Sequence, residues 1–106
     1  MQIQELNNYT RLFDAYGKLL SNKQYEVMDK FLNLDISESE MAELENGSRQ
    51  AIHDALTKAK RQLIELEEKC HFVEKTELLR KMLNELKQEI SMTQSTEMID
   101  NIISNL

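Results

Sequence analysis

The sequence predicts an all-α fold, and three observations support that prediction. The 106 residues contain no proline and only two glycines, so the chain lacks the residues that usually mark turns between strands. Apolar residues make up 41% of the chain and recur at steps of three and four, as on one face of a helix. Side chains that cap helices stand just before several of these stretches.

The first two predicted helices span about residues 2–20 and 22–33. Gly17 is the weak point of the first helix, because glycine costs about 1 kcal/mol against alanine inside a helix. Ser21 and Gln24 form a capping box in front of the second helix. The residues expected to be buried are Ile3, Leu6, Tyr9, Leu12, Phe13, Tyr16, Leu19 and Leu20 in the first helix, and Tyr25, Met28, Phe31 and Leu32 in the second.

A short helix and a long helix follow, joined by a tight turn. Ser37 and Glu40 form the capping box of the short helix. The residues Glu45-Asn46-Gly47 are predicted to turn because asparagine and glycine tolerate positive φ, and Ser48 caps the long helix. The apolar residues of the short helix are Met41, Ala42 and Leu44.

The long helix carries an apolar seam with heptad spacing, whose register slips near residues 70–76. Such a slip predicts a stutter, a bend or a helix break. The polar residues 91–95 are expected to end this helical arm, and a short last helix follows. The seam consists of Ile52, Leu56, Ala59, Leu63, Leu66, Cys70 and Val73, then Phe72, Leu79, Leu83, Leu86 and Ile90; the last helix carries Met98, Ile99, Ile102, Ile103 and Leu106.

These elements predict two parts, a helical domain at residues 1–66 and a helical arm at residues 67–106 for dimerisation or partner binding. The arm has more large apolar side chains than its last helix can cover, which predicts a homodimer. The competing outcome is a monomer whose long helix breaks near Lys75-Thr76 and folds back. The expected interface residues are Leu66, Cys70, Val73, Leu79, Leu83, Leu86 and Ile90.

The net charge of −6 is unevenly distributed along the chain. Residues 48–63 contain four basic residues and one acidic residue, a net charge of +3, whereas the segments on both sides are acidic. The acidic total argues against indiscriminate nucleic-acid binding, because neutralisation of phosphates by lysine and arginine dominates that affinity. A small basic docking face remains compatible with it.

A short helix, a tight turn and a capped second helix follow the plan of a helix-turn-helix, here at about residues 37–62. In that motif the second helix enters the major groove, where Gln50 would read an adenine edge and Arg49 would bind phosphate. An ordinary helical hairpin with a solvated face has the same spacing and stays open as an alternative. The predicted nucleic-acid-binding residues are Ser48, Arg49, Gln50, His53, Thr57, Lys58, Lys60 and Arg61.

No arrangement typical of catalysis or metal binding can be read from the sequence. Cys70 and His71 are adjacent, and no second cysteine or histidine lies at ligand spacing. The single cysteine excludes an internal disulfide, and Cys70 is expected to be a small buried apolar residue. No apolar run approaches the ~18 residues of a membrane span. We therefore expect a cytoplasmic protein that acts by binding, without a cofactor.

Several blocks of the sequence form a recognisable set with fixed spacing. They are Leu12-Phe13, Tyr16, Leu19-Leu20-Ser21, Lys23-Gln24, Ser37, Glu40-Met41-Ala42-Glu43 and Ser48-Arg49-Gln50-Ala51-Ile52. These blocks resemble the YlxM family, small bacterial helix-turn-helix proteins similar to region 4 of RNA polymerase sigma factors. The resemblance runs from about residue 6 to residue 72 without a gap. It implies a sigma-region-4-like helix-turn-helix, a regulatory role, and a link to the signal recognition particle pathway, through the particle's RNA or its GTPase protein.

The chain departs from the family pattern around the short helix. The family usually has leucine where Glu38 stands, and an aromatic residue, glycine and valine at positions 45–47. Glu45 and Gly47 thus remove two apolar contacts that would hold the two helices of the motif together. Leu44 is expected to replace one of these contacts by a small rotation of the helix. The acidic short helix favours an alternative function, a protein-protein adaptor that no longer binds nucleic acid. Its five acidic residues are Asp35, Glu38, Glu40, Glu43 and Glu45.

Overall fold

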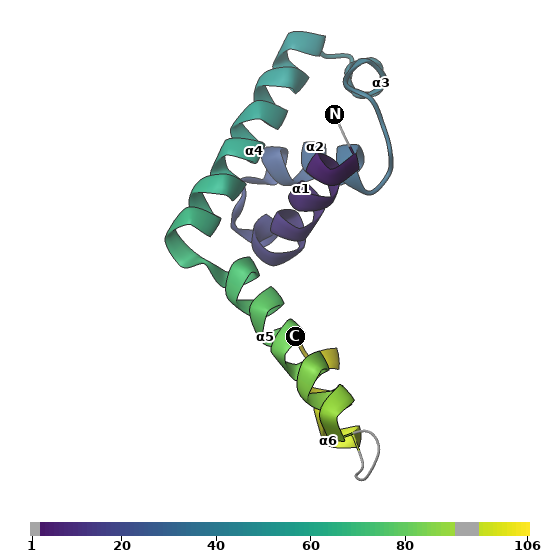
Figure 1. The fold of residues 1–106 in the computed structure, drawn as a ribbon. Coiled ribbons are helices and arrows are strands. Elements are labelled where there is room, and N and C mark those ends of the chain that lie inside the picture. Colours follow the sequence, from purple (N-terminus) through teal and green to yellow (C-terminus); the bar gives the residue numbers. More distant parts are fainter. Residues whose placement is uncertain (1–2, 91–95) are drawn as a thin grey trace. The chain divides into compact units, whose positions relative to one another are not determined.

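The computed structural model describes residues 3–90 and 96–106 (Figure 1). Every regular element in these ranges is helical, which confirms the all-α fold. The predictions for the side chain of Ile3 and for residues 91–95 fall outside the described part. The elements are α1 (Ile3–Tyr16), the 3-10 helix η1 (Gly17–Leu19), α2 (Asn22–Leu32), α3 (Glu38–Leu44), α4 (Arg49–Cys70), α5 (Phe72–Ile90) and α6 (Glu97–Ser104).

The chain divides into two compact units, Met1–Cys70 and His71–Leu106. The division falls between α4 and α5, whereas the sequence placed it after residue 66, inside α4. The first unit contains the predicted helix-turn-helix, and the second is a hairpin of two helices.

In the first unit, α1, α2 and α3 pack against α4 (Figure 1). The buried residues of α4 lie four, three and four positions apart, so they form one face of the helix, as the seam predicted. At the edge of this core, the hydroxyl of Tyr16 donates a hydrogen bond of 2.6 Å to the carboxylate of Glu67. The core residues are Phe13, Tyr16, Leu20, Val27, Met28, Met41, Ala42, Ile52, Leu56, Ala59 and Leu63.

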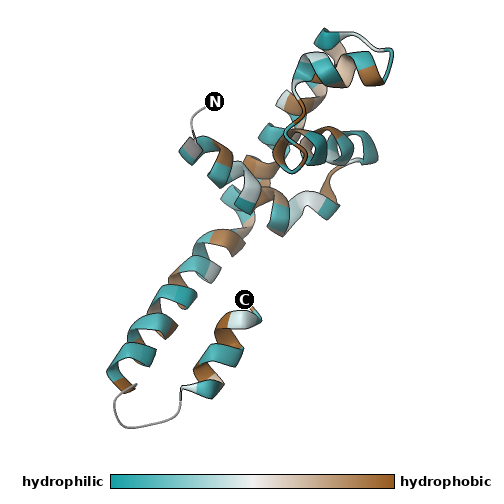
Figure 2. Ribbon diagram, turned by 90° about the vertical axis from the view of Figure 1, so that its right-hand side faces the viewer, coloured by the Kyte–Doolittle hydropathy of each residue, from teal (hydrophilic) through white to brown (hydrophobic). Residues whose placement is uncertain are grey.

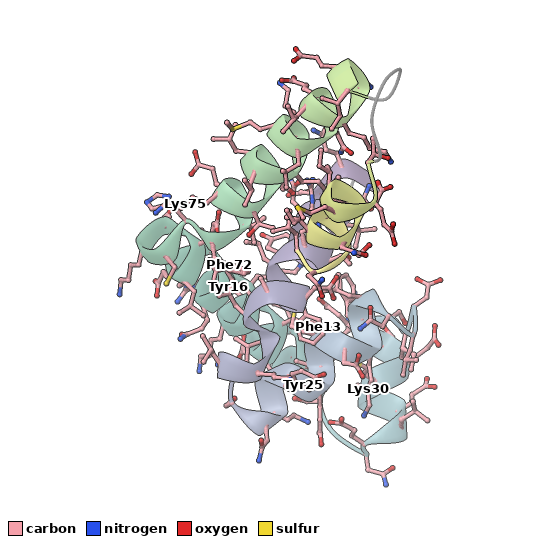
Figure 3. All side chains as sticks on the ribbon, turned by 90° about the horizontal axis from the view of Figure 1, so that it is seen from below. Phe13, Tyr16, Tyr25, Lys30, Phe72 and Lys75 are labelled. Carbon is pink, nitrogen blue, oxygen red and sulfur yellow. The ribbon has the colours of Figure 1, made fainter. Side chains whose placement is uncertain are left out.

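The first helix ends earlier than predicted, because α1 stops at Tyr16 and η1 begins at Gly17. A Cβ atom on Gly17 would lie 3.0 Å from the Phe13 ring and 3.4 Å from the Tyr25 ring, so glycine permits the close approach of these groups. The two rings pack with their centroids 5.0 Å apart (Figure 3). Leu19 is 63% exposed, and Tyr25 is 41% exposed although its ring packs on Phe13. The predicted burial of Leu19 and Tyr25 is therefore wrong.

The predicted helix starts are confirmed by their capping hydrogen bonds. Ser21 and Gln24 make both bonds of a capping box in front of α2. The Ser37 hydroxyl accepts a hydrogen bond of 3.2 Å from the backbone N–H of Glu40. The Ser48 hydroxyl accepts one of 3.0 Å from a backbone N–H in the first turn of α4. Each cap satisfies an N–H group that the helix itself leaves unpaired.

The turn between α3 and α4 is built around Asn46. Asn46 has a φ of 52°, and the N–H of Gly47 donates a hydrogen bond of 3.0 Å to the carbonyl of Ala42. This pairing is that of a Schellman motif with asparagine in the left-handed position. The tight turn is confirmed, but only Asn46 takes positive φ.

The slip in the seam is a helix break. Helix α4 ends at Cys70, His71 takes a φ of 55°, and α5 starts at the next residue. Leu63 is the last fully buried seam residue of α4. Cys70 lies two turns beyond it and is exposed, so the prediction of a buried cysteine is wrong.

The second unit is a helical hairpin in which α6 runs back beside α5 (Figure 2). Lys87 of α5 and Asp100 of α6 form an ion pair of 2.5 Å. Ile99 of α6 is the one buried residue among the described residues of this unit, and α5 has none. Met82 of α5 is 56% exposed.

Candidate nucleic-acid interface

The helix-turn-helix is assembled from α3, the turn at Asn46, and α4. Met41 and Ala42 of α3 are buried, and α3 packs against the N-terminal part of α4. The Schellman turn and the Ser48 cap fix where α4 begins. The polar residues at the start of α4 are therefore presented by a well-packed support.

Most of the predicted nucleic-acid-binding residues are exposed along the first four turns of α4. Arg49, Lys58 and Arg61 supply positive charge on this surface. Such a helix face has what contact with phosphates and base edges requires: solvent access and hydrogen-bond donors. The exposed members are Ser48, Arg49, Gln50, His53, Thr57, Lys58 and Arg61.

Lys60 differs from the others because it is half-buried. Its ammonium group lies 5.4 Å from the centroid of the Tyr9 ring and 5.0 Å from that of Phe31. Burial lowers the pKa of Lys60 below its usual 10.5, and nearby carboxylates oppose this in part. Lys60 therefore does not lie on the exposed face with the other predicted nucleic-acid-binding residues. It lies four residues after Leu56 and three before Leu63, so it belongs to the edge of the buried face.

A groove of about 460 Å³ separates the starts of α3 and α4, lined by Glu38, Arg49, Gln50 and His53. The Nδ1 atom of His53 lies 3.1 and 3.3 Å from the two carboxylate oxygens of Glu38. The Gln50 side-chain amide donates a hydrogen bond of 2.9 Å to Asp54. Two of the predicted contact residues are thus engaged by acidic neighbours in the free protein.

Glu45, like Glu38, is an acidic residue where the family usually has another residue type, and it also pairs with neighbouring side chains. Its carboxylate accepts hydrogen bonds from Lys23 and, at 3.2 Å, from Lys30, both on α2. These bonds lower the pKa of Glu45 below its usual 4.5. Glu38 and Glu45 therefore tie α3 to α4 and α2 through polar contacts. Leu44 is 67% exposed, so the apolar contact expected of it is wrong.

Sequence reasoning missed Lys23 and Lys30, which orient the support of the helix-turn-helix. They lie 22 and 15 residues from Glu45, so no local spacing connects them. The only signal of this pairing in the sequence was the opposite charge of the two lysines and Glu45.

The predicted dimer-interface residues are divided between the two units. Leu66 and Cys70 belong to the first unit and the others to the second. Cys70, Leu79 and Leu86 are exposed, whereas the remaining four are half-buried. The interface stays a prediction. The four half-buried members are Leu66, Val73, Leu83 and Ile90.

Within residues 3–90 and 96–106, no three His, Cys, Asp or Glu side chains gather as metal ligands would. None of the described helices is both long and apolar enough to cross a membrane.

Comparison with known proteins identifies the family. The family model described as "UPF0122: Putative helix-turn-helix protein, YlxM / p13 like" matches residues 3–102. The chain belongs to the UPF0122 family. The match covers both compact units and confirms the resemblance seen in the sequence. The UPF0122 family is described as a helix-turn-helix family and not as a family of enzymes.

Bacterial members of the UPF0122 family are similar to this chain over most of its length. A UPF0122 protein of Fusobacterium nucleatum is 32% identical over 103 residues, covering 97% of this chain and 100% of the relative. One of Shouchella clausii is 35% identical, covering 90% and 87%. One of Clostridium acetobutylicum is 37% identical, covering 86% and 84%.

Proposed function

We propose that this protein is a regulator that binds DNA or RNA through the exposed face of α4. The observation that supports the proposal is the exposure of Arg49, Lys58 and Arg61 on the second helix of a helix-turn-helix. They lie in the segment of net charge +3 in an otherwise acidic chain. The protein acts by binding, in the cytoplasm, without a catalytic step or a cofactor.

Each exposed side chain has a role that follows from its chemistry. Arg49, Lys58 and Arg61 bind phosphates, and the hydroxyls of Ser48 and Thr57 donate to phosphate oxygens. Gln50 reads a base edge, and His53 hydrogen-bonds a phosphate or a base. Lys60, held against two rings, adds positive potential from the edge of the face.

Fluorescence-anisotropy titration with a duplex DNA and an RNA hairpin tests the proposal. With three or four phosphate contacts, the logarithm of the association constant should fall with the logarithm of salt with a slope of about −3. Arg49→Ala and Lys58→Ala should weaken all sequences alike, whereas Gln50→Ala should change the preference between them.

A variant that should gain affinity makes the test sharper. Asp54 places a negative charge on the binding face and holds the Gln50 amide. Asp54→Ala removes both effects, and we expect binding to tighten about two- to five-fold at low salt. Asp14→Ala, at an exposed carboxylate of α1, is the matched control and should leave the affinity unchanged. Equal effects of the two variants would contradict the assignment of the face.

We further propose that the regulated process is the signal recognition particle pathway. The support is the resemblance to the YlxM family, with the basic face of α4 suited to the particle's RNA and the acidic remainder suited to a basic protein surface. Co-sedimentation of the purified components tests it. The absence of any complex at micromolar concentration and low salt would contradict a role in the signal recognition particle pathway, but not nucleic-acid binding itself.

The second candidate function is a protein-protein adaptor. The net charge of −6 and the placement of Glu38 beside Arg49 and His53 favour it, because a carboxylate in this groove repels phosphate. If the titration at low salt shows binding to neither DNA nor RNA, the adaptor replaces the regulator. Homodimerisation is compatible with both functions.

A further inference from the structure

Helix α5 exposes an apolar stripe on the side that α6 leaves uncovered. Leu78, Leu79, Met82 and Leu86 are 57%, 44%, 56% and 47% exposed. Their spacing places them on one face of the helix. Lys87, which pairs with Asp100, marks the side covered by α6. Leu83 and Ile90 are half-buried on that side.

The stripe ends in opposite charges. Lys75 lies seven residues before Met82 and Glu89 lies seven residues after it, so all three share one face of α5. Both charged side chains are exposed. Glu85, also exposed, lies seven residues after Leu78 and adds a second carboxylate near Glu89. The stripe is therefore positive at its N-terminal end and negative at its C-terminal end, with Leu78, Leu79, Met82 and Leu86 between the two ends.

We propose that this stripe binds the same stripe of a second copy of the chain, with the two α5 helices antiparallel and the two-fold axis at Met82. Antiparallel pairing about this axis places each residue opposite the one at the same distance on the other side of Met82. Leu78 then meets Leu86 of the partner subunit, and Lys75 meets Glu89 of the partner subunit. Met82 meets its own copy on the axis.

The charges of Lys75 and Glu89 indicate both that the stripe binds a second copy of the chain and that the two α5 helices run antiparallel. A parallel pair would place Lys75 on the partner's Lys75 and Glu89 on the partner's Glu89, and like charges directly opposite each other are unfavourable. A stripe that complements itself when reversed is what an isologous two-fold interface requires. A different partner would not need this symmetry.

The proposal also explains how the second unit obtains a core. Ile99 is the one buried residue in the described part of this hairpin. Two hairpins joined through α5 would form a four-helix arrangement with shared apolar contacts between them. The dimer would carry two copies of the helix-turn-helix unit, which raises the avidity for any target with two sites. The proposal does not depend on nucleic-acid binding and can be tested without it.

Sedimentation equilibrium over a dilution series is the primary test, with Met82→Glu as the disrupting variant. The native chain should pass from 12.5 kDa towards twice that mass as its concentration rises. Met82→Glu places two carboxylates together on the axis and should raise the dimer dissociation constant about 100-fold or more. Asn84→Glu, at an exposed position on the opposite side of α5, is the matched control and should leave the constant unchanged. A mass of 12.5 kDa at every concentration, or equal effects of both variants, would overturn the proposal.

A charge exchange tests the direction without touching the apolar residues. Lys75→Glu and Glu89→Lys should each weaken the dimer about 3- to 10-fold, because each creates two like-charge contacts. The double variant restores both ion pairs and should return to within about twofold of the native constant. In a parallel dimer neither single exchange would weaken association, and that result would overturn the antiparallel arrangement. Circular dichroism confirms that each variant keeps its helix content.

Discussion

The two units contain amphipathic helices of similar length but bury them to different extents. Helix α4 has 22 residues and α5 has 19, and both repeat apolar residues at helical spacing. The face of α4 is covered by three helices and includes Leu56 and Leu63, which are 1% and 0% exposed. The face of α5 packs on α6 within the second unit, and α5 contains no buried residue. Periodicity therefore identifies a shared face, but the number of helices packed on it determines the core.

The largest expected effect is a core truncation in the first unit. Leu63→Ala should lower the free energy of unfolding by about 3 kcal/mol, because it removes a fully buried side chain. Leu78→Ala is the matched truncation in α5 and should cost less than about 1 kcal/mol at low protein concentration, since Leu78 is already exposed. Urea denaturation of both variants measures the difference, and equal losses would contradict the comparison.

A smaller, pH-dependent effect is expected at Glu45. Hydrogen bonds from Lys23 and Lys30 lower the pKa of Glu45 below 4.5, so its stabilising contribution is present above that pH and is lost as the pH falls through the lowered pKa. Glu45→Gln should cost about 1 kcal/mol at neutral pH and progressively less as the pH falls below 4.5 and through the lowered pKa. Glu43→Gln, at an exposed neighbour on α3, is the matched control and should leave the free energy of unfolding unchanged at neutral pH. Urea denaturation at neutral pH and at a series of acidic pH values measures the effect.

The smallest effect separates two lysines of α4. Burial lowers the pKa of Lys60, so its protonated form is disfavoured in the folded state, and Lys60→Met should keep or slightly raise the free energy of unfolding at neutral pH. For the same reason, the free energy of unfolding should rise as the pH increases through the lowered pKa of Lys60. Lys58→Met should leave stability unchanged but weaken nucleic-acid binding about threefold, more than Lys60→Met does. If Lys60→Met weakened nucleic-acid binding more than Lys58→Met, the phosphate contact would be made by Lys60 instead.

Local features of the fold could be predicted from the sequence because they depend on neighbours in the chain. The cap at Ser48 and the buried face from Ile52 to Leu63 follow from spacings of three and four. The position of Lys60 follows from the same spacing, measured from Leu56 and Leu63, but its positive charge suggested a solvent-exposed site.

Features that depend on distant partners could not be predicted. The contacts of Glu38 with His53, and of Glu45 with α2, join residues at least 15 positions apart, and only the packed fold brings them together. The exposure of Cys70 depends on where the covering helices end, and a seam of seven apolar positions does not contain that information.

The central claim is that the first unit is stable within one chain, whereas the second gains stability by association with another copy. Hydrogen-deuterium exchange of the full chain over a dilution series tests it directly. The amides of residues 52–63 should be strongly protected at every concentration, and protection of residues 78–86 should rise with concentration. Equal protection of both segments at the lowest concentration would contradict the claim, as would protection of residues 78–86 that does not change with concentration.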